Sequence, residues 1–413
     1  MNGEETGYSK LRVTQMSISI PNGIPPFYAE MPAMDRIPAD ETFDGTWPFA
    51  AKFFHGNGFA QHYIDEGEGD PIVLLHGEPM WGYLYRSFIP ALSKTHRVIV
   101  PDHMGFGKSA TPQDKEYCLR THVLNLIGLL DSLSLKKKIT FFVQDWGALI
   151  GLHYALRFPD KIARIMLGSC LPMPSTLKDK VAFFGGYEPA SDGRMPLPGV
   201  IRARPELRGS PTGTAMVPST LWFPWVLTGL PDDPDYICPS LPSARNPNPR
   251  GRTEQVLLNM GSTSMHVIGH LMGIENKKVM NSTWVRAYSA PFPNVESCIG
   301  ALNFPMEAMG QLSLSPEAHV FHFEAVTEEN VAALKALPIQ MVVGRKDRAI
   351  SVAKVRNVSA SYGDCPYVII ENAGHFIQED APETIVALLQ MFIQSTGGAV
   401  PAFESAMGVA KAQ

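Results

Sequence analysis

Short apolar runs that alternate with helical periodicity are the feature that most limits how this chain can fold. The run 139–143 has the composition of a buried strand, and 147–158 has the apolar spacing of a helix. The same patterns predict strands at 58–65, 71–75, 97–100, 164–167, 339–343 and 367–370, and helices at 119–133, 351–362 and 383–394. Strands that alternate with helices predict an α/β fold, in which helices flank a mostly parallel central sheet.

One long stretch, 171–290, interrupts this alternation. It is rich in proline and glycine and carries isolated aromatic residues, and its predicted helices are short. We interpret it as a mainly helical cap inserted into a core that comprises 46–170 and 291–396. The N-terminal extension 1–45 is expected to be extended or disordered, and the C-terminal tail 397–413 to be loose.

Composition excludes several classes of protein. The 413 residues are 45% hydrophobic and 18% charged, which is typical of globular proteins, and a net charge of −5 gives no indication of a nucleic-acid partner. The sequence has no run of about 18 apolar residues that would predict a membrane span. Its first residues lack the basic start and apolar core of a secretory leader. The five scattered cysteines are most simply interpreted as reduced thiols of a cytoplasmic protein.

Asp145 lies at the junction between the strand 139–143 and the helix 147–158. A sharp turn from strand to helix presents the side chain at its apex above the end of the sheet. The backbone N–H groups at the start of the helix favour a negative charge there. A carboxylate at this apex, where most enzymes of this arrangement have serine, indicates attack on a saturated carbon. Taken alone, Asp145 is explained equally well as a helix N-cap.

Two further polar residues follow strands later in the chain. Asp347 comes after the strand 339–343, and His375 comes after 367–370. Because the carboxyl ends of parallel strands share one edge of a sheet, we expect both side chains to lie near Asp145. His375 would act as a base, and Asp347 would orient its imidazole. Each residue alone has an ordinary structural explanation, and it is the order nucleophile, acid, histidine that favours catalysis.

A second motif, His76-Gly77-Glu78-Pro79, follows the strand 71–75. The backbone N–H of Glu78 is expected to point at the strand–helix junction, and the N–H of Trp146 to complete a pair of donors. Two such donors form an oxyanion hole. Pro79 has no N–H and cannot contribute. The alternative explanation of this motif is a plain turn.

Five segments together carry a resemblance to a known family. They are 76–86, 102–109, 143–147, 290–293 and 372–379. They resemble the haloalkane dehalogenases of the α/β-hydrolase fold, over roughly 47–170 and 285–395. The motif Gln144-Asp145-Trp146-Gly147 is fairly specific, because the related epoxide hydrolases usually have histidine before the aspartate.

Two departures from the family pattern indicate a subgroup. Glu78 stands where some members have asparagine, and 168–174 contains no acidic residue. The resemblance therefore implies the subgroup whose catalytic acid is an aspartate after a later strand, which is Asp347 here. In that subgroup Trp146 and a tryptophan of the cap bind the halide; Trp222 and Trp225 are the two candidates, and Trp222 is the better local match.

The chemistry that the resemblance implies is hydrolysis of a haloalkane to a primary alcohol and halide. Asp145 would form an alkyl ester, which water activated by His375 would cleave, with no metal or organic cofactor. The expected partners are therefore the haloalkane, water and halide, with neither nucleic acid nor membrane. His266 and His270 lack the carboxylate partner of a zinc site and are interpreted as surface or packing residues.

Two other functions remain open from the sequence. An epoxide hydrolase would use the same aspartate and histidine together with cap tyrosines, for which Tyr187, Tyr236 and Tyr288 are available. Gln144 and the halide-binding tryptophan argue against it. A non-catalytic binding protein of the α/β-hydrolase fold would have no need of the complete set Asp145, Asp347 and His375.

Overall fold

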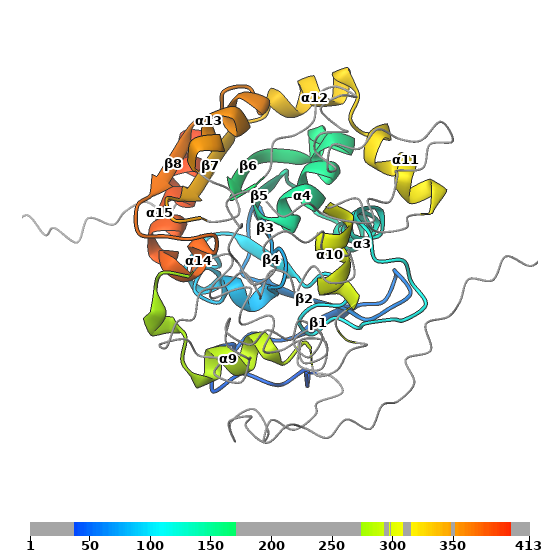
Figure 1. Cartoon of the computed structure of the whole chain (residues 1–413), viewed down its shortest axis with the longest axis vertical. Coiled ribbons are helices and arrows are strands. Elements are labelled where there is room, and N and C mark those ends of the chain that lie inside the picture. Colours follow the sequence, from blue (N-terminus) through cyan, green and yellow to red (C-terminus); the bar gives the residue numbers. More distant parts are fainter. Residues whose placement is uncertain are drawn as a thin grey trace, which may run out of the picture. The chain divides into compact units, whose positions relative to one another are not determined.

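A central sheet organises the part of the chain that the computed structural model describes, residues 37–170, 274–292, 297, 299–308, 315–347 and 352–397. Its eight strands lie in the order β1-β2-β4-β3-β5-β6-β7-β8 (Figure 1). The strands are β1 (Lys52–Phe54), β2 (Gln61–Glu66), β3 (Pro71–Leu75), β4 (Arg97–Pro101), β5 (Ile139–Gln144), β6 (Ile162–Gly168), β7 (Ile339–Gly344) and β8 (Tyr367–Ile370).

The sheet is parallel from β4 to β8, and β1 and β2 join it as antiparallel strands at one edge. Every residue of β3 and β5 is buried, as expected for central strands covered on both faces. Val143 of β5 pairs with Leu75 of β3, and Gln144 pairs with Gly168 of β6. The carboxyl ends of these strands therefore meet at one edge. The predicted mostly parallel sheet is confirmed.

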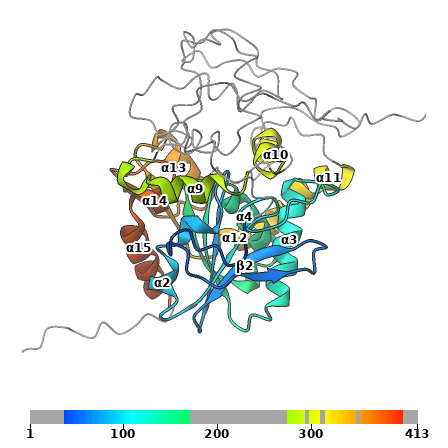
Figure 2. The same ribbon diagram turned by 90° about the horizontal axis from the view of Figure 1, so that it is seen from below.

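Helices cover both faces of the sheet (Figures 1 and 2). On one face α3, α4 and α12 pack together, and α2 and α15 lie on the other. The helices are η1 (Gly82–Tyr85), α2 (Ile89–Leu92), α3 (Leu119–Ser132), α4 (Trp146–Arg157), η2 (Pro159–Lys161), η6 (Lys277–Val279), α9 (Ser282–Ser289), α10 (Ile299–Ala308), α11 (Pro316–Glu324), α12 (Glu328–Lys335), α13 (Val352–Ser361), α14 (Ile377–Asp380) and α15 (Pro382–Ser395).

None of these helices has both the length and the apolar character needed to cross a bilayer. The four helices predicted by range match α3, α4, α13 and α15 to within two residues at each end. The sequence patterns did not predict α2, α10, α11, α12 and α14. Thr327 caps the start of α12 by accepting the N–H of Asn330, but half of the eight residues of that helix are polar and its amphipathic signal is weak.

The segment before β1 packs on the core. Phe43 and Trp47 are fully buried, and both contact the indole ring of Trp81 edge to face. The Nζ of Lys108 donates to the carbonyl oxygens of Ala39 and Glu41 at 2.8 Å each. The extension expected at 1–45 is therefore folded from residue 37 onward, and residues 1–36 lie outside the described residues.

Helix α9 belongs to the stretch that was expected as the end of the cap. It packs directly on the core, because the Nε1 of Trp81 donates to the carbonyl oxygen of Ala287 at 2.9 Å. Residues 171–273 and 398–413 lie outside the described residues, so the cap boundaries and the loose tail stay predictions.

Candidate active site

Asp145 occupies a strained turn between β5 and α4. Its backbone angles are φ 54° and ψ −126°, a conformation that costs a residue with a side chain about 1–3 kcal/mol. Two glycines make the turn sterically feasible. A Cβ at Gly147 would lie 2.3 Å from the carbonyl oxygen of Leu75, and a Cβ at Gly77 would lie 2.3 Å from Asp145 Oδ1. The loop after β3 and the start of α4 therefore close tightly around this carboxylate.

The backbone of Glu78 provides one of the two predicted donors. Its N–H donates to Asp145 Oδ1 at 2.9 Å. This bond holds Oδ1 in place, and the second oxygen, Oδ2, remains available to react. The N–H of Trp146 lies at the first position of α4, where backbone N–H groups have no partner within the helix.

The three predicted catalytic side chains come together at the carboxyl edge of the sheet. His375 Nε2 lies 3.4 Å from Asp145 Oδ2, and His375 Nδ1 lies 3.0 Å from Asp347 Oδ2. The imidazole is fully buried, whereas 18% of the Asp145 side chain is exposed. The carboxylate therefore reaches accessible space while the histidine is shielded behind it.

The pKa of His375 depends on both neighbouring carboxylates. Burial alone lowers this pKa, but the negative charge of Asp347, with the charge of Asp145 and the hydrogen bonds to both groups, outweighs burial and raises it to about 10. A neutral Asp145 would remove part of this stabilisation of the imidazolium. The basicity of His375 is therefore tied to the charge state of Asp145.

A pair of histidines holds the loop that carries Glu78. The backbone N–H of His103 donates to His76 Nε2 at 3.0 Å, and His103 Nε2 lies 2.8 Å from the carbonyl oxygen of His76. Burial lowers the pKa of His76 well below its usual value, so its ring is neutral and can accept that bond. Both residues stand in the resembling segments 76–86 and 102–109, but their supporting role was not predicted.

The indole of Trp146 is held by helix α10. Its ring stacks on Phe304 with 4.3 Å between ring centroids and 8° between planes. Phe304 in turn stacks on Phe106 at 5.1 Å. No sequence signal identified Phe304, because its contact with Trp146 joins distant parts of the chain. The cap candidates Trp222 and Trp225 lie outside the described residues.

Two adjacent acidic residues hold the loop that carries His375. The carboxylate of Asp380 accepts the backbone N–H of Gly374 at 2.7 Å and those of Glu275 and Asn276 at 2.8 Å. Glu379 accepts two hydrogen bonds from Arg86 at 2.7 Å each. Asp380 therefore joins the histidine loop to the segment that precedes α9, and Glu379 joins α14 to Arg86.

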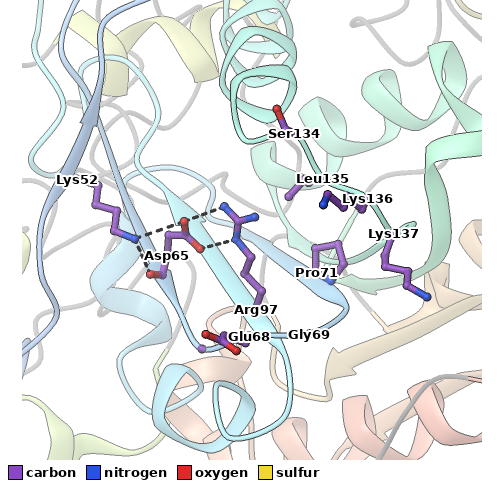
Figure 3. A pocket seen from close by; sticks show the side chains of 11 residues that line it. Lys52, Asp65, Glu68, Gly69, Pro71, Arg97, Ser134, Leu135, Lys136 and Lys137 are labelled. Atoms are coloured by element: carbon purple, nitrogen blue, oxygen red, sulfur yellow. Dashed lines mark hydrogen bonds and ion pairs between the residues drawn. The ribbon is translucent and has the colours of Figure 1, made fainter.

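Within the described ranges, no group of three metal-ligating side chains gathers in one place. A hollow lies at the opposite, amino edge of the sheet, and its lining includes Lys136 and Lys137 (Figure 3). It contains two acidic residues, Glu68 and Asp65. Asp65 is neutralised by two hydrogen bonds from Arg97 and an ion pair with Lys52 (Figure 3).

Comparison with known proteins places this geometry in a family. Residues 70–190 match the family described as alpha/beta hydrolase fold. The chain is 31% identical to haloalkane dehalogenase 1 of Mycobacterium tuberculosis over 375 residues, which are 84% of this chain and 97% of the relative. It is 45% identical to a cis-3-alkyl-4-alkyloxetan-2-one decarboxylase of Shewanella oneidensis over 126 residues, which are 30% of this chain and 40% of that relative.

A solved structure shares the fold. The haloalkane dehalogenase DbeA-M1 loop variant from Bradyrhizobium elkanii superimposes with a TM-score of 0.56 at 19% identity, over 84% of this chain and 97% of that one. The long alignment with the Mycobacterium tuberculosis relative covers nearly all of that protein. This chain therefore belongs to the haloalkane dehalogenases, α/β-hydrolase-fold hydrolases that act on carbon–halogen bonds.

Proposed function

We propose that this protein hydrolyses haloalkanes to a primary alcohol and halide through a covalent alkyl ester on Asp145. The single observation that carries the proposal is the chain of contacts from Asp145 Oδ2 to His375 Nε2 and from His375 Nδ1 to Asp347. This arrangement supplies a nucleophile, a base and a group that orients the base.

In the first step Asp145 Oδ2 attacks the carbon that bears the halogen. The bond from Oδ2 to carbon forms, the carbon–halogen bond breaks, and the halide leaves with the bonding electron pair. The N–H of Glu78 keeps Oδ1 in place, so the attacking oxygen is presented in one orientation. The Nε1–H of Trp146 is a donor without an acceptor that would repel the anion, and we assign it to the departing halide. Trp222, with Trp225 as the alternative, is the proposed second donor.

In the second step water cleaves the ester. Esterification neutralises Asp145 and so removes one of the charges that raise the pKa of His375, which loses its proton to solvent and then accepts the proton of the attacking water at Nε2. The water oxygen bonds to the carboxyl carbon of Asp145, and the N–H groups of Glu78 and Trp146 are the proposed stabilisers of the oxyanion. The alcohol leaves with the proton from His375. Asp145 releases one proton as it becomes a carboxylate again, and His375 regains its resting proton from solvent, so each haloalkane turnover releases one proton.

An epoxide hydrolase that relies on cap tyrosines is less well supported. The hydroxyl of Tyr288 is fully buried and donates to Glu379 Oε1 at 2.5 Å, so its proton is already used in a structural hydrogen bond. Tyr187 and Tyr236 lie outside the described residues.

Halide release and trapping of the ester test the proposal. Wild-type protein is expected to release halide from 1,2-dibromoethane and from a panel of short and long haloalkanes. His375→Phe removes the base, so it is expected to gain the mass of the alkyl group on Asp145, seen by mass spectrometry of its peptides. Asp145→Asn is the control that forms no adduct. Absence of halide release across the panel, or an unmodified His375→Phe protein after exposure, would overturn the ester mechanism.

A further inference from the structure

The carboxyl group of Glu78 has no role in the steps above, which use only the backbone N–H of this residue. The side chain is 3% exposed, and its Oε1 is buried without a hydrogen-bond partner among the described residues. A buried carboxylate that lacks a partner is costly, and a protonated carboxyl avoids that cost. The burial of Glu78 Oε1 without a partner therefore favours a protonated carboxyl group at this position.

The surroundings of Glu78 favour the same conclusion. Burial raises its pKa well above the usual value and the negative charge of Asp145 raises it further, while His375 opposes these effects only in part. The N–H of Glu78 lies 2.9 Å from Asp145 Oδ1, so the carboxyl group belongs to the residue that touches the reacting carboxylate. A protonated carboxyl group is an O–H donor, which the triad itself lacks.

We propose that Glu78 is a general acid of this site, and that it extends the reaction to saturated ring carbons whose leaving atom is an alkoxide oxygen, as in epoxides. The inference rests on the proposed function, because Asp145 supplies the nucleophile in both reactions. A halide leaves as a stable anion, whereas the oxygen of an opened epoxide needs a proton.

The protons balance over a full cycle. Asp145 Oδ2 bonds to the ring carbon, the carbon–oxygen bond breaks, and the leaving oxygen takes the proton of Glu78. Ester hydrolysis then proceeds through His375 as before. The proton that Asp145 sheds in that step returns to Glu78. Ring opening of an epoxide therefore yields a diol with no net release of acid, whereas each haloalkane turnover releases one proton.

The charge on Asp145 links the two carboxyl groups. While Asp145 is negative it helps to keep the proton on Glu78, and bond formation to carbon removes that charge. Glu78 becomes a stronger acid at the moment when negative charge develops on the leaving oxygen. This timing is what a general acid requires.

The test compares leaving groups in matched substrates. Wild-type protein is given 1-bromohexane and 1,2-epoxyhexane, and kcat/KM is measured for each by product analysis. Glu78→Gln keeps the size and the backbone N–H but cannot give up a proton. The ratio of kcat/KM for oxygen leaving groups to that for bromide is expected to fall about 10²-fold in this variant. Glu78→Asp, which keeps an acid, is expected to restore part of the ratio.

The outcomes separate this inference from the proposed function. Bromide release by wild-type protein without opening of the epoxide overturns the role of Glu78 and leaves dehalogenation standing. An equal loss for bromide and oxygen leaving groups in Glu78→Gln does the same. Opening of a ring substrate that depends on Glu78, in a protein that releases no halide, supports the acid and overturns the dehalogenase function.

A spectroscopic measurement on the resting protein needs no turnover. Infrared difference spectra of wild-type protein against Glu78→Gln are expected to contain the C=O stretch of a protonated carboxyl, shifted in D₂O. Glu379→Gln is the matched control, since Glu379 is equally buried but its carboxylate accepts two bonds from Arg86. If Glu78→Gln does not fold, judged by circular dichroism, Glu78→Asp replaces it in the difference spectrum. A spectrum without the protonated band in wild-type protein overturns the proposal.

Discussion

At the scale of single residues, the charge on Asp145 sets the behaviour of its neighbours. It contributes to the high pKa of His375 and to the high pKa of Glu78. Both contributions end when Asp145 is esterified. One bond to carbon therefore makes His375 available as a base and Glu78 a stronger acid, with no movement of the backbone.

The raised pKa of His375 predicts a pH-dependent stability. Its folded-state pKa is about 10 against an ordinary 6.5, so protonation stabilises the folded protein fully below pH 6.5, and this contribution is lost as the pH rises through about 10. The free energy of unfolding of wild-type protein should therefore fall relative to that of His375→Gln over this interval. Urea denaturation of the two proteins across the pH range measures it, and parallel curves would contradict the prediction.

The close approach of Gly77 to the nucleophile predicts a steep loss of activity. A Cβ at this position would lie 2.3 Å from Asp145 Oδ1 and would displace the carboxylate, so Gly77→Ala is expected to lower kcat for 1,2-dibromoethane about 10²-fold. Gly168→Ala is the matched control, because its added Cβ meets its nearest neighbour at 3.3 Å. Similar rates for the two variants, both folded by circular dichroism, would refute the steric argument.

At the scale of secondary-structure elements, the site is assembled from strand ends and fixed by helices. Strands β5, β7 and β8 deliver Asp145, Asp347 and His375 to one edge. The sequence predicted these strands closely, because each is a short apolar run followed by a polar residue. Helix α10 was not predicted, and it fixes the plane of the Trp146 indole through Phe304.

The stack between α10 and Trp146 predicts an effect on halide binding. Phe304→Leu removes an aromatic contact worth about 1 kcal/mol, so the indole loses its fixed orientation and the halide Kd should rise about five-fold. Phe304→Tyr keeps the ring and should bind halide as wild-type protein does. Quenching of tryptophan fluorescence by bromide measures both. Equal Kd values for the Leu and Tyr variants would show that the stack does not position Trp146.

At the scale of the whole molecule, the segment that precedes β1 and helix α9 pack against each other on the same part of the core. Asp44 accepts hydrogen bonds from Thr283 and Arg286 of α9, and Phe43 and Trp47 bury their rings beneath. The N-terminal segment is therefore part of the folded core from residue 37 onward.

This packing predicts a large loss of stability when the indole ring of Trp47 is removed. Trp47→Ala leaves a cavity among fully buried aromatic side chains, so the free energy of unfolding should fall by about 3–5 kcal/mol. The neighbouring Pro48 is exposed, and Pro48→Ala is the control that should change little. Denaturant titration of both variants decides the matter. A loss below about 1 kcal/mol for Trp47→Ala would place the segment outside the cooperative core.

The sequence by itself determined the parallel sheet and the polar residues that follow its strands. Local patterns suffice for both, since apolar runs, helical spacing and turn residues act over a few positions. The tertiary structure alone decided which distant groups meet. It buries Glu78 Oε1 without a hydrogen-bond partner among the described residues, stacks Phe304 on Trp146 and bonds the Tyr288 hydroxyl to Glu379. These contacts join residues that are far apart in the chain, so no local pattern predicts them. Burial determines the protonation of the groups that they bring together, and burial too is not specified by a local pattern.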